Sequence, residues 1–79
     1  MEHYVVYILF SSKLNRYYVG QTSNIEKRLK VHNKGGKKYT TKGIPWILVK
    51  VYEFTNRSEA VLLERKIKKR GIKRYLAEN

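Results

Sequence analysis

The stretch RYYVGQTSNIEKRLKVH, residues 16–32, changes character halfway along its length. Its first half is rich in aromatic and β-branched residues and runs into a glycine, which is typical of a strand that ends or bends. In the second half, Ser23 and Glu26 have the spacing of a capping box, and apolar residues then recur one helical turn apart. The stretch therefore predicts a strand followed directly by a helix that begins at about residue 24.

Two further strands are predicted on either side of this stretch. Residues 4–10, YVVYILF, are apolar or aromatic throughout. They indicate a strand that is covered on both faces and pairs with the next strand as a hairpin. Residues 46–54, WILVKVYEF, follow the single proline and predict a third strand, half or fully buried.

The C-terminal third of the chain is predicted to be helical. Asn56 and Glu59 repeat the capping spacing, so we expect a helix to open there and to continue to about residue 70. Gly71 interrupts or ends this helix, and residues 72–79 predict a last short helical turn. The order strand–strand–helix–strand–helix predicts a single α/β (α+β) domain over residues 1–79, with a small, mostly antiparallel sheet flanked by helices.

The composition favours a folded protein that faces nucleic acid. The 18 Lys and Arg residues against six acidic residues, all Glu, give a formal charge of +12, an excess that favours polyanionic partners. The chain has no cysteine, which excludes disulfides and thiolate metal sites. We expect no membrane span, because no apolar run is long enough, and a cytoplasmic protein, because the first residues lack the pattern of a secretory signal.

Three polar residues of the two predicted helices are candidates for chemistry. Arg28 and His32 lie one turn apart, so both can project from one helix face and together hold a phosphate and move a proton. Taken singly, they are better explained as a surface arginine and a helix-end histidine. Glu64 borders the apolar face of its helix, where it is either the ion-pair partner of a nearby cation or a ligand for a hard divalent cation.

The predicted hairpin carries Tyr7 and Tyr18, and strand tyrosines are most often packing residues with a polar tip. Tyr17 and Tyr18 are neighbours in a strand, so they must point to opposite faces and cannot serve one site. Gly20 lies on the same face as Tyr18, where a glycine marks a bulge or the close approach of a ligand or another backbone.

Two groups of basic residues are expected to contact phosphates, because the net charge is too one-sided for self-neutralisation. One group lies in the loop after the first helix and the other in the last long helix. The candidates are Lys34, Lys37, Lys38, Lys42, Lys66, Lys69 and Arg70. Tyr39 and Trp46 near the loop are candidates to stack on bases, although Trp46 is expected to be partly buried.

Five of these positions form an ordered set of short motifs. The predicted hairpin reads VVY, ending at Tyr7, and then YVG, ending at Gly20. Arg28 and His32 follow one turn apart, and Glu64 comes later in EAVLLERKIKK. In this order, over essentially the whole chain, the sequence resembles the GIY-YIG nuclease domain. It resembles above all the small stand-alone bacterial members, and also the N-terminal domain of the excision-repair incision subunit.

The resemblance implies a three-stranded antiparallel sheet flanked by helices, the GIY-YIG endonuclease fold. It also implies cutting of DNA phosphodiester bonds with one divalent ion, Mg²⁺ or Mn²⁺, held by Glu64. Arg28 would neutralise charge that develops on the phosphate. Tyr7, Tyr18 and His32 would position water and move protons, with either Tyr7 or His32 as the general base.

The sequence departs from the family pattern in three places. The first motif lacks both its Gly and its Ile, and Gln21 stands where several relatives carry a Lys. The candidate for an Asn that many members place near the phosphate is Asn79, the final residue. We also expect no second DNA-binding domain, so binding would depend on backbone charge or nucleic-acid shape rather than on sequence.

The leading hypothesis is a metal-dependent endonuclease that acts on DNA and favours branched or distorted structures, with RNA open as a substrate. Two alternatives remain: a non-catalytic, basic nucleic-acid-binding module, and a subunit that needs a protein partner for activity. The nuclease hypothesis requires the five motif positions to converge on one concave face.

Overall fold

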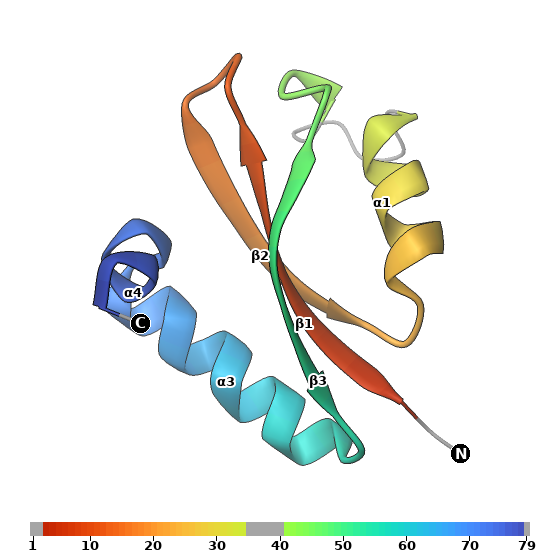
Figure 1. Cartoon of the computed structure of the whole chain (residues 1–79), viewed down its shortest axis with the longest axis vertical. Coiled ribbons are helices and arrows are strands. Elements are labelled where there is room, and N and C mark those ends of the chain that lie inside the picture. Colours follow the sequence, from red (N-terminus) through yellow and green to blue (C-terminus); the bar gives the residue numbers. More distant parts are fainter. Residues whose placement is uncertain (1–2, 35–40, 79) are drawn as a thin grey trace.

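The computed structural model describes residues 3–34 and 41–78 (Figure 1). Its strands are β1 (Tyr4–Ser11), β2 (Arg16–Thr22) and β3 (Ile47–Phe54). Its helices include α1 (Ile25–Asn33), α3 (Arg57–Arg70) and α4 (Ile72–Glu78). This is the predicted α+β order of elements.

The three strands form one antiparallel sheet in the order β2-β1-β3. The central strand β1 is buried along most of its length, as its apolar composition predicts. Tyr7 of β1 lies directly opposite Gly20 of β2. The pairing of β1 with β3 shifts by one residue at Val49, which is therefore a bulge on β3.

Alternate side chains of β1 enter two apolar clusters on opposite faces of the sheet. Val6 and Ile8 pack with residues of α3 and α4 on one face. Val5 and Leu9 pack with residues of α1 and with Trp46 on the other face. Figure 1 shows the same arrangement, with α1 on one side of the sheet and α3 and α4 on the other. We call these the α1 face and the α3 face.

The starts of the two longer helices differ in how well the sequence predicts them. The predicted cap Ser23 is wrong by one residue: Asn24 is the N-cap of α1, and its side chain accepts a hydrogen bond from the backbone N–H of Lys27. The Thr22 hydroxyl accepts a hydrogen bond from the backbone N–H of Asn24 and donates one to its carbonyl oxygen. These bonds hold Asn24, rather than Ser23, in the capping position. The predicted cap Asn56 is confirmed, since it accepts from two backbone N–H groups of α3.

The end of α3 is also as predicted. Gly71 has a φ of 94°, which a residue with a side chain rarely adopts, and it separates α3 from α4. Arg70 then binds Glu78 with two hydrogen bonds of 2.6 Å, so the last residues of α3 and α4 are fastened together. Within the described ranges, no helix combines the length and the apolar character needed to cross a bilayer.

The strand β3 is more exposed than the sequence predicts. Ile47, Leu48 and Val49 are among the exposed large apolar side chains, so the expectation of a half- or fully buried strand is wrong for its first half. The physical reason is position: β3 is an edge strand, and α1 and α3 both cover the sheet mainly over β1 and β2.

Candidate active site

A buried hydrogen bond joins β1 to α1 on the α1 face. The Tyr7 hydroxyl oxygen and Nε2 of His32 are 3.1 Å apart, and the two residues are only 1% and 2% exposed. When the imidazole carries its proton on Nδ1, the Tyr7 hydroxyl donates to Nε2; in the other tautomer Nε2–H donates to the hydroxyl oxygen. A phenol and an imidazole in contact away from water form a pair between which a proton can move.

Tyr18 completes an aromatic cluster around this pair. Its ring centroid is 4.9 Å from that of His32 and 6.3 Å from that of Tyr7. Tyr18 also contacts Trp46, with 6.2 Å between ring centroids. Tyr18 is half-buried, so a ligand reaches the cluster first at its ring. The structure thus brings together three of the five motif residues, and we call Tyr7, Tyr18 and His32 the aromatic cluster.

Gly20 gives the Tyr7 ring the room it needs. A methyl group at position 20 would lie 2.6 Å from the Tyr7 hydroxyl oxygen and 2.8 Å from the ring carbon that bears it. Both contacts are far inside van der Waals distance, so a side chain here would displace the phenol. The sequence attributes this glycine to a bulge or to an approaching ligand or backbone. The structure gives a different reason, because the neighbour that requires the glycine is the Tyr7 side chain.

Asn33, which the sequence analysis did not single out, ties the end of α1 to the start of β3. Its side-chain oxygen accepts a hydrogen bond of 2.7 Å from the Trp46 backbone N–H, and its amide nitrogen donates one of 3.2 Å to the Trp46 carbonyl. Trp46 in turn contacts Tyr18, and Asn33 follows His32, so this pair of bonds fixes both sides of the aromatic cluster. Asparagine is common at helix ends, so its presence here does not predict from the sequence that it contacts Trp46.

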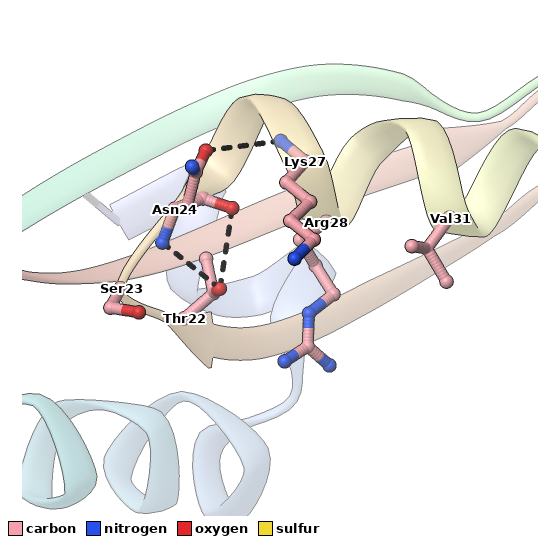
Figure 2. Close-up of a pocket in the computed structure, with 6 residues that line it drawn as sticks. All are labelled: Thr22, Ser23, Asn24, Lys27, Arg28 and Val31. Atoms are coloured by element: carbon pink, nitrogen blue, oxygen red, sulfur yellow. Dashed lines mark hydrogen bonds between the residues drawn. The ribbon is translucent and has the colours of Figure 1, made fainter.

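Arg28 lies one turn before His32 on α1 and lines a hollow of about 270 Å³. The hollow is formed where β2 passes into α1, and Thr22, Ser23 and Lys27 also line it. Figure 2 shows the Lys27 and Arg28 side chains leaving α1 on the same side, with the Arg28 guanidinium reaching well away from the helix backbone. Arg28 has no salt bridge in the part of the chain that the structure describes. Its charge is therefore available to an anion.

Glu64 lies in the other layer of the molecule. Its helix α3 covers the α3 face, where the neighbouring residue Leu63 packs into the apolar cluster. The Glu64 side chain is 16% exposed. Its carboxylate forms a salt bridge of 2.8 Å with Lys68, one turn later. The five motif residues therefore do not all lie on one face of the sheet, and the expected convergence on one concave face is wrong. The nuclease hypothesis then requires a substrate that bends around the edge of the sheet. A ligand that touches both Glu64 and the aromatic cluster has to pass around the edge strand β2.

The sequence comparison identifies the family. The family model for the GIY-YIG catalytic domain matches residues 3–75, nearly the whole chain. The chain belongs to the GIY-YIG family. Its GIY-YIG domain is of a nuclease type, and nucleic acid is the class of substrate that this domain implies.

Relatives of similar size belong to the same group of small bacterial GIY-YIG proteins. A UPF0213 protein of Staphylococcus haemolyticus is 44% identical over 68 residues, covering 85% of this chain and 80% of the relative. A UPF0213 protein of Streptococcus pneumoniae is 35% identical over 83 residues, covering all of this chain and 84% of the relative. The solution NMR structure of the UPF0213 protein BH0048 from Bacillus halodurans has a TM-score of 0.59 and is 33% identical, covering 96% of this chain and 83% of that one.

GIY-YIG nucleases generally use a divalent metal, which needs side chains of the protein as ligands. Among residues 3–34 and 41–78, no three His, Asp or Glu side chains gather into a metal cluster. Glu64 alone fits a Mg²⁺-type site, because this ion often takes one or two carboxylates and completes its shell with water and phosphate oxygens. Lys68, now paired with Glu64, would have to yield to the ion.

The basic candidates of this GIY-YIG domain fall into three groups. Lys34, Lys42, Lys66 and Lys69 are exposed, and Lys42 lines a hollow together with Tyr18 and Trp46. Arg70 is engaged by Glu78, so it has a structural role that the sequence did not reveal. Two basic candidates lie outside the described residues, Lys37 and Lys38, as do the other candidates Tyr39 and Asn79. Trp46 is only 5% exposed, so its ring is a packing partner of Tyr18 and offers no face for a base.

Proposed function

We propose that this GIY-YIG protein is a divalent-metal-dependent endonuclease that hydrolyses DNA phosphodiester bonds and selects its substrates by structure rather than by sequence. The observation that carries the proposal is the buried hydrogen bond between Tyr7 and His32, with Tyr18 against it. A purely binding module has no need to bury a phenol–imidazole pair next to a surface arginine. The net charge of +12 supports a polyanionic substrate.

Arg28 is assigned to the scissile phosphate. Its guanidinium lies in an open hollow at the end of β2, and arginine binds phosphate oxygens through two parallel hydrogen bonds. Negative charge increases on the non-bridging oxygens as water attacks the phosphorus. A fixed cation lowers the energy of that state more than that of the ground state.

Tyr7 and His32 are assigned to the proton. The Tyr7 hydroxyl oxygen takes the proton of the attacking water while its own proton passes to Nε2 of His32, so that charge and atoms balance. In this scheme His32 is the final acceptor, which suits a group whose ordinary pKa is about 6.5, whereas that of tyrosine is about 10. Because Tyr7 and His32 are only 1% and 2% exposed, the scheme requires the attacking water to reach the Tyr7 hydroxyl past the half-buried Tyr18.

Glu64 would hold Mg²⁺ or Mn²⁺, which would polarise the phosphate and stabilise the leaving oxygen. Because Glu64 is on α3 and the aromatic cluster is on the α1 face, the nucleic acid would lie along the edge of β2. A flexible or branched strand follows such a curved path more easily than a straight duplex, which is the reason for the proposed structural selectivity.

The test is a cleavage assay with flap, four-way-junction and plain duplex DNA, and with the matching RNA flap, each in Mg²⁺, Mn²⁺ or EDTA. We expect metal-dependent nicking of the branched DNA, lost in Glu64→Gln and strongly reduced in Tyr7→Phe. Glu59→Gln is the matched control, because it makes the same change at an exposed glutamate of the same helix that has no part in the proposed chemistry. Cleavage that persists in EDTA or in Glu64→Gln would refute the metal-dependent mechanism.

A second candidate function is a nucleic-acid-binding module that does not cleave, alone or as the subunit of a protein complex. The salt bridge between Glu64 and Lys68 favours it, because the proposed metal ligand already has a cationic partner. This candidate predicts salt-sensitive binding of the same DNA without nicking in any metal. It also predicts that Glu64→Gln binds as tightly as the wild type.

A further inference from the structure

Three shallow hollows follow one another around the end of β2 and onto α3. The first is the Arg28 hollow, which Thr22 and Ser23 line at one end. These two residues also line the second hollow, whose far side is formed by Arg57 at the start of α3. Arg57 is shared in turn with the third hollow, on the outer side of α3. The shared residues make the three hollows one continuous path, which we call the α3 track.

The residues that line the α3 track carry positive charge without compensation. Lys27, Arg28, Arg57 and Arg65 line it, and none of its described lining residues is acidic. In the described part of the chain, none of these four forms a salt bridge. Elsewhere on α3 and α4, Lys68, Arg70 and Arg74 are paired with a glutamate, whereas Lys66, Lys69 and Lys73 form no salt bridge within the described residues. The track is therefore distinguished by four cations that line joined hollows without an acidic side chain among them.

The third hollow combines these cations with apolar surface. It measures about 390 Å³ and is lined by Val61 and Leu62 between Arg57 and Arg65. Leu62 is 64% exposed, the most exposed large apolar side chain in the described part of the chain. Arg57 and Arg65 are eight residues apart on one helix, which places them about 12 Å apart along its axis. Two cations that flank an exposed leucine match a nucleotide strand, which offers phosphates at intervals and apolar base faces between them.

The proposed metal ligand lies beside the same path. Glu64 is seven residues after Arg57, two helical turns, and is therefore on nearly the same side of α3. A strand that reaches Glu64 from the Arg28 hollow consequently meets Arg57 first.

We propose that the outer side of α3 is a second nucleic-acid contact site, in which Arg57 and Arg65 bind backbone phosphates and Leu62 packs against an unstacked base at a branch or a distortion. This inference deepens the proposed function, because it names what makes the substrate structure-selective. It concerns binding, however, and so it can fail or hold independently of cleavage. A protein partner fits the site less well, because four uncompensated cations line the path without any acidic residue among them.

The first test measures the affinity for a flap and for a plain duplex, in EDTA, over a range of salt concentrations. The slope of log K against log salt is negative, and in the variant Arg57→Ala/Arg65→Ala it should become less negative by about 1.8, the value for two lost phosphate contacts on duplex DNA. The control Lys13→Ala/Lys73→Ala removes the same charge from exposed residues that line none of the three hollows. A slope for the arginine variant equal to that of the control overturns the phosphate site.

The second test concerns Leu62. A fluorescent adenine analogue, whose emission rises when it is unstacked, is placed at the branch point of the flap. We expect wild-type protein to raise the emission and Leu62→Ala to abolish the rise while leaving the salt slope unchanged. An emission that is the same with Leu62→Ala as with wild type overturns the apolar contact, and failure of the wild type to bind either DNA overturns the whole inference.

DNA cleavage is measured separately from binding, so that failure of the nuclease proposal can be distinguished from failure of the α3 site. If the wild type never nicks DNA but both binding results hold, the α3 site stands and the nuclease proposal fails. If the wild type nicks DNA with Mg²⁺ but the arginine variant behaves like its control, the nuclease proposal stands and the α3 site fails. Binding of the chain to another protein through Arg57 and Leu62, with unchanged DNA affinity in both variants, would assign the site to a protein partner instead.

Discussion

The α1 face and the α3 face treat polar side chains in opposite ways. On the α1 face, Tyr7 and His32 are buried and hydrogen-bonded to each other, in contact with Tyr18. On the side of α3, by contrast, the cations Arg57 and Arg65 are exposed and line the hollow on the outer surface of the helix. A buried polar pair depends on exact geometry, whereas exposed charges act over a distance and tolerate change. Substitutions on the α1 face should therefore affect function through position, and those on the α3 face through charge.

The largest effect expected from this difference comes from Tyr7→Phe. The change removes one buried oxygen and its hydrogen bond to His32, and loss of a proton-transfer group typically lowers the rate by about 100- to 10,000-fold. The measurement is the single-turnover rate of flap nicking, with circular dichroism to check the fold. Tyr17→Phe is the matched control, because Tyr17 belongs to the cluster on the other face. Equal rates for the two variants would remove Tyr7 from the mechanism.

The next largest effect is expected from Gly20→Ala. The added methyl group would lie 2.6 Å from the Tyr7 hydroxyl oxygen, and overpacking of this kind costs about 1–3 kcal/mol in the free energy of unfolding. Chemical denaturation measures it. The double variant Gly20→Ala/Tyr7→Phe has no hydroxyl to displace, so its loss should be smaller than the sum of the two single losses. Strict additivity would show that the glycine does not act through Tyr7.

These two residues also show what a sequence can and cannot predict. The elements follow from local patterns: the apolar run of β1, the cap at Asn56 and the break at Gly71 each lie within a few neighbouring residues. That Gly20 makes room for Tyr7 depends on the register of two strands, which the apolar pattern alone does not reveal. The separation of Glu64 from the aromatic cluster depends on which layer α3 joins, and helical periodicity says nothing about that.

A smaller effect on the α1 face is expected from Asn33. In Asn33→Asp the carboxylate can still accept from the Trp46 N–H but can no longer donate to its carbonyl, whereas Asn33→Ala loses both bonds. We expect losses in unfolding free energy of about 1 kcal/mol for the first and up to about 3 kcal/mol for the second. Trp46 is the only tryptophan of the chain, so its fluorescence reports the change directly. Identical emission and stability in all three proteins would mean that the hydrogen bonds between Asn33 and Trp46 do not stabilise the fold.

The smallest effect belongs to the α3 face and depends on pH. Two hydrogen bonds from Arg70 hold the pKa of the exposed Glu78 carboxyl below its ordinary value of 4.5. A lowered pKa in the folded state means that the pair stabilises the protein above the ordinary pKa, and that this contribution is lost as the pH falls through the lowered one. The midpoint temperatures of thermal unfolding of wild type and Glu78→Gln should therefore differ slightly near neutral pH and become equal in acid.

Arg70→Lys sharpens this last comparison. It keeps the charge but loses the planar fork that bonds both oxygens of Glu78, so it should reproduce most of the Glu78→Gln difference. The effect stays small because both side chains are largely exposed to water, which screens their attraction. A large difference, or one that persists in strong acid, would mean that the junction of α3 and α4 depends on geometry in the same way as the aromatic cluster, and the contrast between the two faces would be wrong.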